Sequence, residues 1–145
     1  MKTEKKTYGM PNVGCMIGTA YQTLAARLGE ILDKSGLDIT VPEYMVLRAL
    51  YTRDGMQQCE IGEMIGKDKA AICRTVKAME KKNLIRTEPI SHKCLKVYIA
   101  DRGHEIKSEI FRIAEERHQA LATLVTPDEL AVFDKVLRKI IQPYN

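Results

Sequence analysis

Residues 60–99 read EIGEMIGKDKAAICRTVKAMEKKNLIRTEPISHKCLKVYI, and this stretch decides the fold. A first apolar run at helical spacing comprises Ile61, Met64 and Ile65. A second run at the same spacing comprises Ile72, Val76 and Met79. The segment Gly66-Lys67-Asp68 interrupts the pattern between them. Two helices joined by so short a turn predict a helix-turn-helix, whose second helix is sized for the major groove of double-stranded DNA.

The ends of the second helix carry their own signals. Asp68 suits an N-cap, because its carboxylate can accept from amides left unpaired in the first turn, and Asn83 tolerates the left-handed backbone angles of a helix end. Beyond residue 83 the apolar period changes to two, which predicts a half-buried strand over residues 95–99 with a partner strand at residues 84–87. Residues 89–93 would then form the exposed tip of a small two-stranded wing.

Positive charge is concentrated on the same stretch. Residues 67–96 contain nine Lys or Arg against three acids, a local balance of +6, whereas the whole chain carries +4, so the rest sums to −2. A polyphosphate partner explains this concentration, because each Lys or Arg that meets a phosphate releases counterions. A solvated helix face is the competing explanation. Motif and charge together favour double-stranded DNA.

Long amphipathic helices flank this region. Residues 12–34 carry an apolar stripe at helical spacing, which Ser35-Gly36 ends. Two capping boxes, Thr40-Val41-Pro42-Glu43 and Thr126-Pro127-Asp128-Glu129, open two further helices. Asp101 is placed to cap a long helix over residues 102–125.

We therefore expect a mainly α fold, α with a small β-hairpin wing. The single domain of residues 1–145 would hold a winged helix-turn-helix at residues 40–100 and dimerisation helices at residues 12–34 and 102–142. A lone winged helix has little surface to cover such apolar helices, so a homodimer is the simplest solution, and packing on the same monomer is the alternative. A two-fold axis would place two recognition helices about one helical turn (~34 Å) apart on a palindromic site.

Composition excludes several classes of protein. No apolar stretch approaches the ~20 residues that span a bilayer, and the amino terminus MKTEKKTYG has no apolar core that would make it a secretory signal. Four cysteines without a Cys-x-x-Cys pair and three dispersed histidines indicate a reduced, cytoplasmic protein without a metal site in one chain, although a metal held between chains stays open. We expect neither an enzyme nor a cofactor, because a Gly-rich phosphate loop, a nucleophile elbow and a carboxylate cluster around a His are all missing.

The order of elements and motifs resembles the MarR family of bacterial transcriptional regulators over nearly the whole chain. Residues 61–66 look like the family's Leu-Ala-x-x-Leu-Gly segment. Residues 74–85 look like its recognition helix and exit, with Asn83 in place of the usual Gly. The family's wing usually runs Asp-x-Arg and later Leu-Thr-x-x-Gly, and here it reads Ser91-His92-Lys93 and later Ile99-Ala100-Asp101-Arg102-Gly103.

The resemblance implies a sequence-specific DNA-binding regulator, a repressor released by a small-molecule or an oxidant signal. The DNA-binding candidates are Lys67, Lys69, Ala70, Ala71, Arg74, Lys77, His92, Lys93 and Lys96. The cations suit major-groove and phosphate contacts, and the two alanines can touch thymine methyl groups. The family's small hydroxyl residues in this helix are Ala70, Ala71 and Cys73 here, and Lys93 replaces the wing Arg that enters the minor groove in relatives. DNA sequence preference is therefore the least transferable property.

Two kinds of signal follow from the same resemblance. A small aromatic ligand would enter a cleft lined by residues such as Tyr21, Met45, Arg48 and Tyr51, and ordinary core and rim residues are the alternative interpretation. One branch of the family senses organic hydroperoxides through a cysteine near the start of the first helix, the place of Cys15. The tyrosine one turn beyond that cysteine is Thr19 here, so an inert cysteine competes with the redox role. Cys73, on the DNA-facing helix, is the second redox candidate.

A winged helix used for protein–protein contact, without specific DNA binding, is the alternative function. Such a module would be expected to carry an exposed apolar face on its second helix. Outside its core stripe, this helix is mostly Lys, Arg and small residues, which favours DNA.

Overall fold

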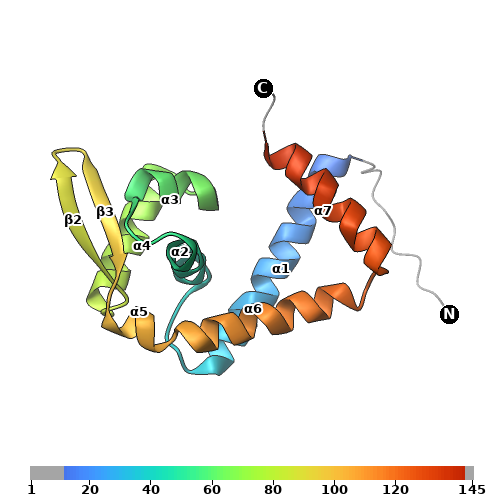
Figure 1. Cartoon of the computed structure of the whole chain (residues 1–145), viewed down its shortest axis with the longest axis horizontal. Coiled ribbons are helices and arrows are strands. Elements are labelled where there is room, and N and C mark those ends of the chain that lie inside the picture. Colours follow the sequence, from blue (N-terminus) through green and yellow to red (C-terminus); the bar gives the residue numbers. More distant parts are fainter. Residues whose placement is uncertain (1–11, 143–145) are drawn as a thin grey trace. The chain divides into compact units, whose positions relative to one another are not determined.

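The computed structural model describes residues 12–142, and the chain divides into two compact units at residue 104 (Figure 1). The first unit holds a small sheet with α1 (Val13–Ser35), α2 (Val41–Thr52), α3 (Gln58–Ile65) and α4 (Lys69–Lys81). The second unit holds α6 (Lys107–Ala122) and α7 (Pro127–Ile141), and a short α5 (Asp101–Glu105) lies where one unit passes into the other. The amino-terminal segment MKTEKKTYG lies outside the described residues, so the expectation about it is not addressed.

Local capping fixes where the helices begin and end. Asn12 accepts from the Gly14 amide at the start of α1 (2.9 Å), and Gly36 closes that helix in the left-handed conformation (φ 74°). At the start of α2, the Glu43 amide donates to Thr40 Oγ1 (3.3 Å) and the Thr40 amide donates to Glu43 Oε1 (2.8 Å). An equivalent reciprocal pair opens α7 at residues 126 and 129. Both predicted capping boxes are confirmed.

The helix-turn-helix forms as predicted. Asp68 Oδ1 accepts from the amide of Ala71 at the start of α4 (2.7 Å), and Asn83 is left-handed (φ 57°) just beyond its end. Ile61 and Ile65 are buried in α3, whereas Met64, the third residue of that apolar run, is 62% exposed. A helix of this length buries only a narrow face, and Met64 lies at the edge of that face.

The predicted hairpin of the wing forms, and a third, unpredicted strand joins it in an antiparallel sheet. The strands β1 (Met56–Gln57), β2 (Ile85–Ser91) and β3 (Cys94–Ile99) lie in the order β1-β3-β2. Two residues are too few to show alternation, so β1 leaves no periodic signal. The tip is also narrower than expected: Pro89 pairs with Leu95, and only His92 and Lys93 form the turn. Proline is tolerated there because β2 is an edge strand.

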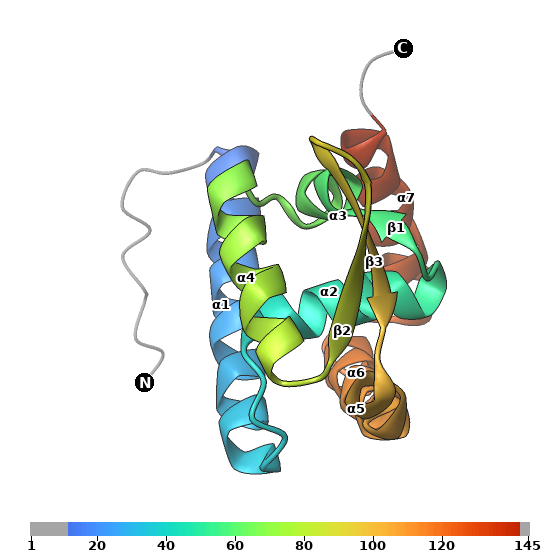
Figure 2. The same ribbon diagram turned by 90° about the vertical axis from the view of Figure 1, so that its left-hand side faces the viewer.

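The apolar core of the first unit joins the recognition helix to the sheet. Its fully buried side chains include Val46, Leu47, Leu50, Ile61, Ile72, Met79, Leu84 and Val97. In Figure 2, α2 lies behind α4 and the strands, and it contacts both. The core therefore holds α4 and the wing in one rigid frame.

Gly103 can lie close to the backbone of Leu84, just beyond the end of α4, because it has no side chain. A Cβ atom there would clash with the carbonyl oxygen of Leu84 and would stand 2.7 Å from Ile99 Cγ2. The Gly103 carbonyl accepts from the hydroxyl of Tyr51 (2.5 Å), and the neighbouring Arg102 donates to the carbonyl of Leu37. These contacts hold α5 against the base of the wing, α2 and the connection between α1 and α2.

The expected continuous helix over residues 102–125 is wrong in two respects. The helical segment starts at Asp101 itself, which is therefore not a cap, and it is interrupted at Ile106 (φ −89°, ψ 0°) before α6 runs to Ala122. Periodicity could not reveal the interruption, because Ile106 keeps helical spacing with the buried Ile110 and Ile113. Within residues 12–142, the structure has no helix long and apolar enough to cross a membrane.

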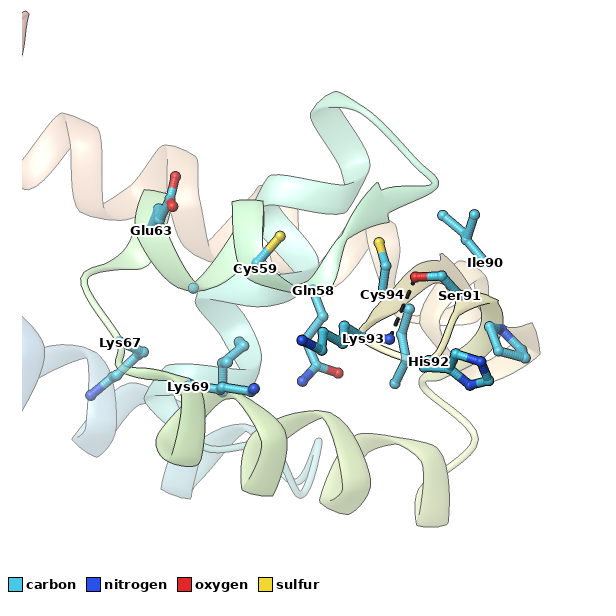
Figure 3. Close-up of a pocket in the computed structure, with 14 residues that line it drawn as sticks. Gln58, Cys59, Glu63, Lys67, Lys69, Ile90, Ser91, His92, Lys93 and Cys94 are labelled. Atoms are coloured by element: carbon cyan, nitrogen blue, oxygen red, sulfur yellow. Dashed lines mark hydrogen bonds between the residues drawn. The ribbon is translucent and has the colours of Figure 1, made fainter.

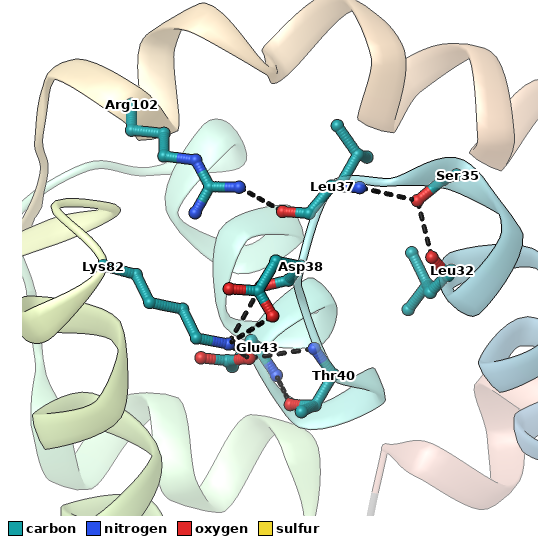
Figure 4. Close-up of polar contacts among 8 residues, drawn as sticks. All are labelled: Leu32, Ser35, Leu37, Asp38, Thr40, Glu43, Lys82 and Arg102. Carbon is teal, nitrogen blue, oxygen red and sulfur yellow. Dashed lines mark hydrogen bonds and ion pairs between the residues drawn. The ribbon is translucent and has the colours of Figure 1, made fainter.

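A buried ion pair anchors the carboxyl end of α4 (Figure 4). The Glu43 side chain is 2% exposed, and its Oε1 accepts from Lys82 Nζ at 2.8 Å. The same ammonium donates to the carbonyl of Asp38 (2.8 Å), in the connection between α1 and α2. Because Lys82 directly follows α4, this cluster ties the end of that helix to the body of the unit.

Candidate nucleic-acid interface

The two faces of α4 differ sharply in polarity. Ile72, Val76 and Met79 are buried, as the spacing predicted. The opposite face is exposed and presents Lys69, Ala70, Arg74 and Lys77. Ala71 and Cys73 are half-buried at its edges. The helix thus shows solvent a face of cations and small side chains, the composition that contacts base edges and phosphates.

A second cationic element is the tip of the wing. His92 and Lys93 are both exposed in the turn between β2 and β3, and the Lys93 amide donates to Ser91 Oγ (3.4 Å). Lys96 stands differently: it is half-buried on β3, between Gln57 of β1 and Glu88 of β2. The exposed charge of the wing is therefore concentrated at its end.

The start of α4 and the tip of the wing border one groove of about 1110 Å³ (Figure 3). Four of the candidate residues line it, namely Lys67, Lys69, His92 and Lys93. The remaining lining comes mainly from the start of α3 and the outer part of the wing. The turn between α3 and α4, the first turn of α4 and the wing thus form one continuous surface, and its charged groups are mostly cationic.

The groove also contains residues that the sequence analysis did not identify. Gln58, Cys59 and Glu63 of α3 line it, together with Ile90 and Cys94 of the wing. Their place depends on β1, which brings the start of α3 against β3. Since β1 left no periodic signal, the sequence held no sign that these residues meet.

At the base of the wing, another cation is already engaged. Arg86 Nη1 lies 2.5 Å from Glu88 Oε1, and the guanidinium stacks over the ring of Tyr98 at 4.4 Å from its centroid. Both partners come from the same sheet. Arg86 therefore supports the shape of the wing, whereas Lys93 and His92 extend from its end.

The residues suggested for an aromatic ligand make separate contacts in the structure. The Tyr21 hydroxyl donates to Met45 Sδ (3.7 Å), which joins α1 to α2. The Tyr51 hydroxyl donates to the Gly103 carbonyl, and burial raises the pKa of Tyr51 to about 12. Arg48 is exposed on α2. None of the four lines the groove between α4 and the wing.

The cysteines suggested as redox residues lie on separate helices. Cys15 is exposed in the first turn of α1, where the carbonyl of its backbone accepts from the Thr19 hydroxyl (3.1 Å). Cys73 is half-buried on α4. Among residues 12–142, the structure brings together no group of three or more His, Cys, Asp or Glu side chains that could hold a metal ion.

Large apolar side chains are exposed along one side of α7. They are Val132, Phe133, Val136, Ile140 and Ile141. On α1, Val13 and Met16 are exposed as well. Scattered apolar residues on a surface are ordinary, but a row at helical spacing on a helix with no buried residue of its own indicates a surface that another protein covers.

Comparisons with known proteins by family model, by sequence and by structure agree. The model of the MarR family matches residues 39–91. The transcriptional regulator HosA of Escherichia coli O111:H- is 24% identical over 106 residues, which cover 72% of this chain and 78% of that protein. A MarR transcriptional regulator from Methanosarcina mazei superposes with a TM-score of 0.79 at 16% identity, over 90% of this chain and 87% of the other. The Staphylococcus aureus MepR–DNA complex superposes with a TM-score of 0.77 at 17% identity, over 90% and 96%.

Proposed function

We propose that the chain is a transcriptional regulator of the MarR family that binds double-stranded DNA as a homodimer, through α4 and the wing. The observation that carries the proposal is the exposed cationic face of α4 beside a cationic wing tip, both bordering one groove. MepR, a protein of the same fold, has been solved in complex with DNA.

In this proposal α4 enters the major groove. Arg74, at the middle of its exposed face, reads a base edge or clamps a phosphate, since a guanidinium offers two parallel donors. Lys69 and Lys77 flank it on the same helix and supply phosphate contacts. Ala70 is exposed and Ala71 half-buried, and both have the methyl groups that pack against thymine. With few hydrogen-bonding groups on the helix, much of the affinity is electrostatic.

The wing provides the second contact. His92 and Lys93 extend from the turn between β2 and β3, where they meet the backbone or the minor groove beside the site of α4. A lysine ammonium neutralises phosphate but lacks the planar fork of arginine, so this contact contributes affinity more than sequence discrimination. Lys67 lies in the turn between α3 and α4 and adds to the same field. Lys96, half-buried between two strands, contributes least.

The homodimer accounts for the exposed apolar row on α7. A second copy of the chain brings an identical apolar surface, and a two-fold interface between such surfaces is self-complementary. The helices of residues 12–34 and 102–142 form this interface, and the winged helix-turn-helix of residues 40–100 remains available to DNA. Two copies of α4 would then lie about one helical turn (~34 Å) apart, matching a palindromic operator.

Regulation by repression and signal-dependent release completes the proposal. A dimer on an operator blocks transcription, and a small aromatic ligand or an oxidant releases it by changing the separation of the two α4 helices. Such a regulator acts in the cytoplasm, where the chromosome is accessible. The competing use of the fold, protein–protein contact without specific DNA binding, is disfavoured because the exposed face of α4 is cationic rather than apolar.

The direct test is a titration of labelled genomic fragments by the wild-type protein and Arg74→Ala. The variant should bind an operator about ten- to a hundredfold more weakly, the loss of ~1–3 kcal/mol expected for a base contact. Arg53→Ala, which removes an exposed arginine that is neither a candidate residue nor part of the groove lining, serves as the matched control and should bind like the wild type. Equal affinity of the Arg74 variant and the control would remove α4 from the interface.

A further inference from the structure

The connection between α1 and α2, residues 36–40, is held by cations from two other elements (Figure 4). Lys82, at the end of α4, donates to the carbonyl of Asp38 (2.8 Å), and Arg102 of α5 donates to the carbonyl of Leu37. We propose that Lys82 and Arg102 are positioning residues for DNA binding, which clamp this connection and thereby set the separation of the two α4 helices in the dimer.

The backbone of the connection has an uncommon shape at the clamped residues. Gly36 (φ 74°) and Asp38 (φ 54°) are both left-handed, a conformation that is unfavourable for a residue with a side chain. Next to them, the Ser35 hydroxyl accepts from the Leu37 amide (3.2 Å) and donates to the carbonyl of Leu32 (2.6 Å). A left-handed residue other than glycine persists where surrounding contacts hold it, and the two cations supply such contacts here.

The ammonium of Lys82 joins three segments at one point. Besides the Asp38 carbonyl, it donates to Glu43 Oε1 in the first turn of α2 (2.8 Å), and the Asp38 carboxylate lies 3.8 Å away. The same Glu43 oxygen accepts from the amide of Thr40, the last residue of the connection (2.8 Å). Because Glu43 is buried, these charged hydrogen bonds form away from water, where they are strong and directional. A displacement of the connection therefore acts on the end of α4.

Arg102 ties the connection to the same end of α4 by a second route. Its side chain donates to the carbonyl of Leu37, and its backbone amide donates to the carbonyl of Asn83, the left-handed residue just beyond α4 (3.1 Å). The adjoining Gly103 carbonyl accepts from the hydroxyl of Tyr51, which holds α5 against α2. Both clamp residues therefore link the connection to the carboxyl end of the recognition helix, one through its own position and one through α5.

The connection is also the place where α1 passes into the DNA-binding region. Leu28 and Leu32, near the end of α1, are 3% and 2% exposed, so this end of the helix is packed into the first unit. The consequence for DNA rests on the proposed function, in which α1 belongs to the dimer interface. In such a dimer, the separation of the two α4 helices depends on how each is held to its own α1. The clamp fixes that relation, so the protein should prefer one spacing of half-sites.

Two pairs of variants separate a loosened clamp from an intact one. Arg102→Met removes the donor and keeps an unbranched stem, whereas Arg102→Lys keeps a donor for the Leu37 carbonyl. Asp38→Val introduces a β-branched residue that disfavours the left-handed conformation, so it should displace the carbonyl that Lys82 holds. Asp38→Gly adopts the same conformation freely. Arg102→Met and Asp38→Val should therefore loosen the clamp, and their two partners should keep it.

Hydrogen exchange of the full chain tests the clamp without DNA. In the two loosened variants, the amides of Leu37 and Thr40 should exchange faster than in the wild type, because each is bonded to a side chain next to the clamped carbonyls. The amides of β3 should keep their wild-type rates, which shows that the rest of the fold is intact. Wild-type rates at Leu37 and Thr40 in both loosened variants would overturn the clamp.

Anisotropy titrations with DNA test the positioning role. An operator selected by the wild type is compared with a single half-site and with operators whose half-sites lie one base pair closer together or further apart. The loosened variants should bind the full operator about two- to thirtyfold more weakly, the range for residues that couple two sites. They should also discriminate less between the spacings. Their affinity for the half-site and their salt slope should stay unchanged, because no phosphate contact is lost. Arg102→Lys and Asp38→Gly should behave like the wild type.

Each contrary result overturns a different statement. A loosened variant that keeps the wild-type preference for one spacing would overturn the positioning role. So would an equal loss of affinity for the full operator and the half-site, since that is the effect of lowered stability alone. A smaller salt slope of Arg102→Met would show that Arg102 contacts a phosphate itself. If the wild type retained no genomic fragment, the proposed function would fail and the positioning role with it, while the exchange rates would still decide the clamp.

Discussion

Removing the ammonium of Lys82 should destabilise the fold more than removing its ammonium and the charge of Glu43 together. Lys82→Met leaves the Glu43 carboxylate, only 2% exposed, without its cation. Its Oε1 would keep the Thr40 amide as a donor (2.8 Å), and Oε2 has no hydrogen-bond partner among the described residues. The substitution therefore creates a buried charge with a single donor, which is costly because the carboxylate has lost its water.

The magnitude follows from the burial of the two partners. Removing one member of a fully buried ion pair costs about 3–5 kcal/mol. Lys82 keeps 24% of its side chain in solvent, which lets water reach the vacated site and favours the lower end of that range. The double variant Glu43→Gln/Lys82→Met removes the buried charge but keeps an oxygen that accepts from the Thr40 amide, so its cost should be about 1–2 kcal/mol.

Urea unfolding followed by circular dichroism measures these differences. With a slope of about 2 kcal/mol per molar, Lys82→Met should lower the midpoint by about 1.5 M, and the double variant by about 0.5–1 M. All variants are compared at one protein concentration, since a dimer's stability depends on it. A Lys82→Met protein as stable as the double variant would refute the reasoning, because the unpaired carboxylate would then carry no cost.

Three further predictions concern the wing, the dimer and the packing of α5. Lys93→Ala should lower operator affinity and reduce the slope of log affinity against log salt concentration by about one, the value for one phosphate contact. An unchanged slope in anisotropy titrations would show that the wing tip does not contact a phosphate. Phe133→Glu places a charge in the apolar row of α7, where Phe133 is 55% exposed in a single chain, so sedimentation velocity should show dissociation, whereas Lys135→Glu should not. Tyr51→Phe removes the donor to the Gly103 carbonyl and should lower the free energy of unfolding by about 1 kcal/mol below pH 10. Burial raises the pKa of Tyr51 to about 12 in the folded protein, so folding favours the protonated phenol and the difference should shrink as the pH rises from 10 toward 12. A Tyr51→Phe protein as stable as the wild type at neutral pH would contradict this last prediction.

The features that sequence could predict are those with a local chemical cause. Asp68 caps α4 and Asn83 ends it because a carboxylate and a small polar residue satisfy helix ends wherever they occur. The same holds for Thr40 with Glu43, whose reciprocal hydrogen bonds need only four consecutive residues. Alternation over residues 95–99 likewise gave β3, since one face of that strand is buried.

The features that sequence could not predict depend on distant contacts. β1 exists because Met56 and Gln57 find β3 some forty residues later, and nothing in two residues announces it. Pro89 extends β2 because that strand is an edge, a fact of the assembled sheet. Cys59 of α3 and Cys94 of β3 come to line one groove through the same pairing, so this part of the groove became visible only with the fold.

The most direct test is to select bound fragments from the host genome and to footprint them with the purified protein. A two-fold interface that presents two copies of α4 predicts a protected palindrome with half-sites about one helical turn (~34 Å) apart, occupied by two chains. A protein that sediments as a single chain and retains no genomic fragment, even at low ionic strength where phosphate contacts are strongest, would contradict it.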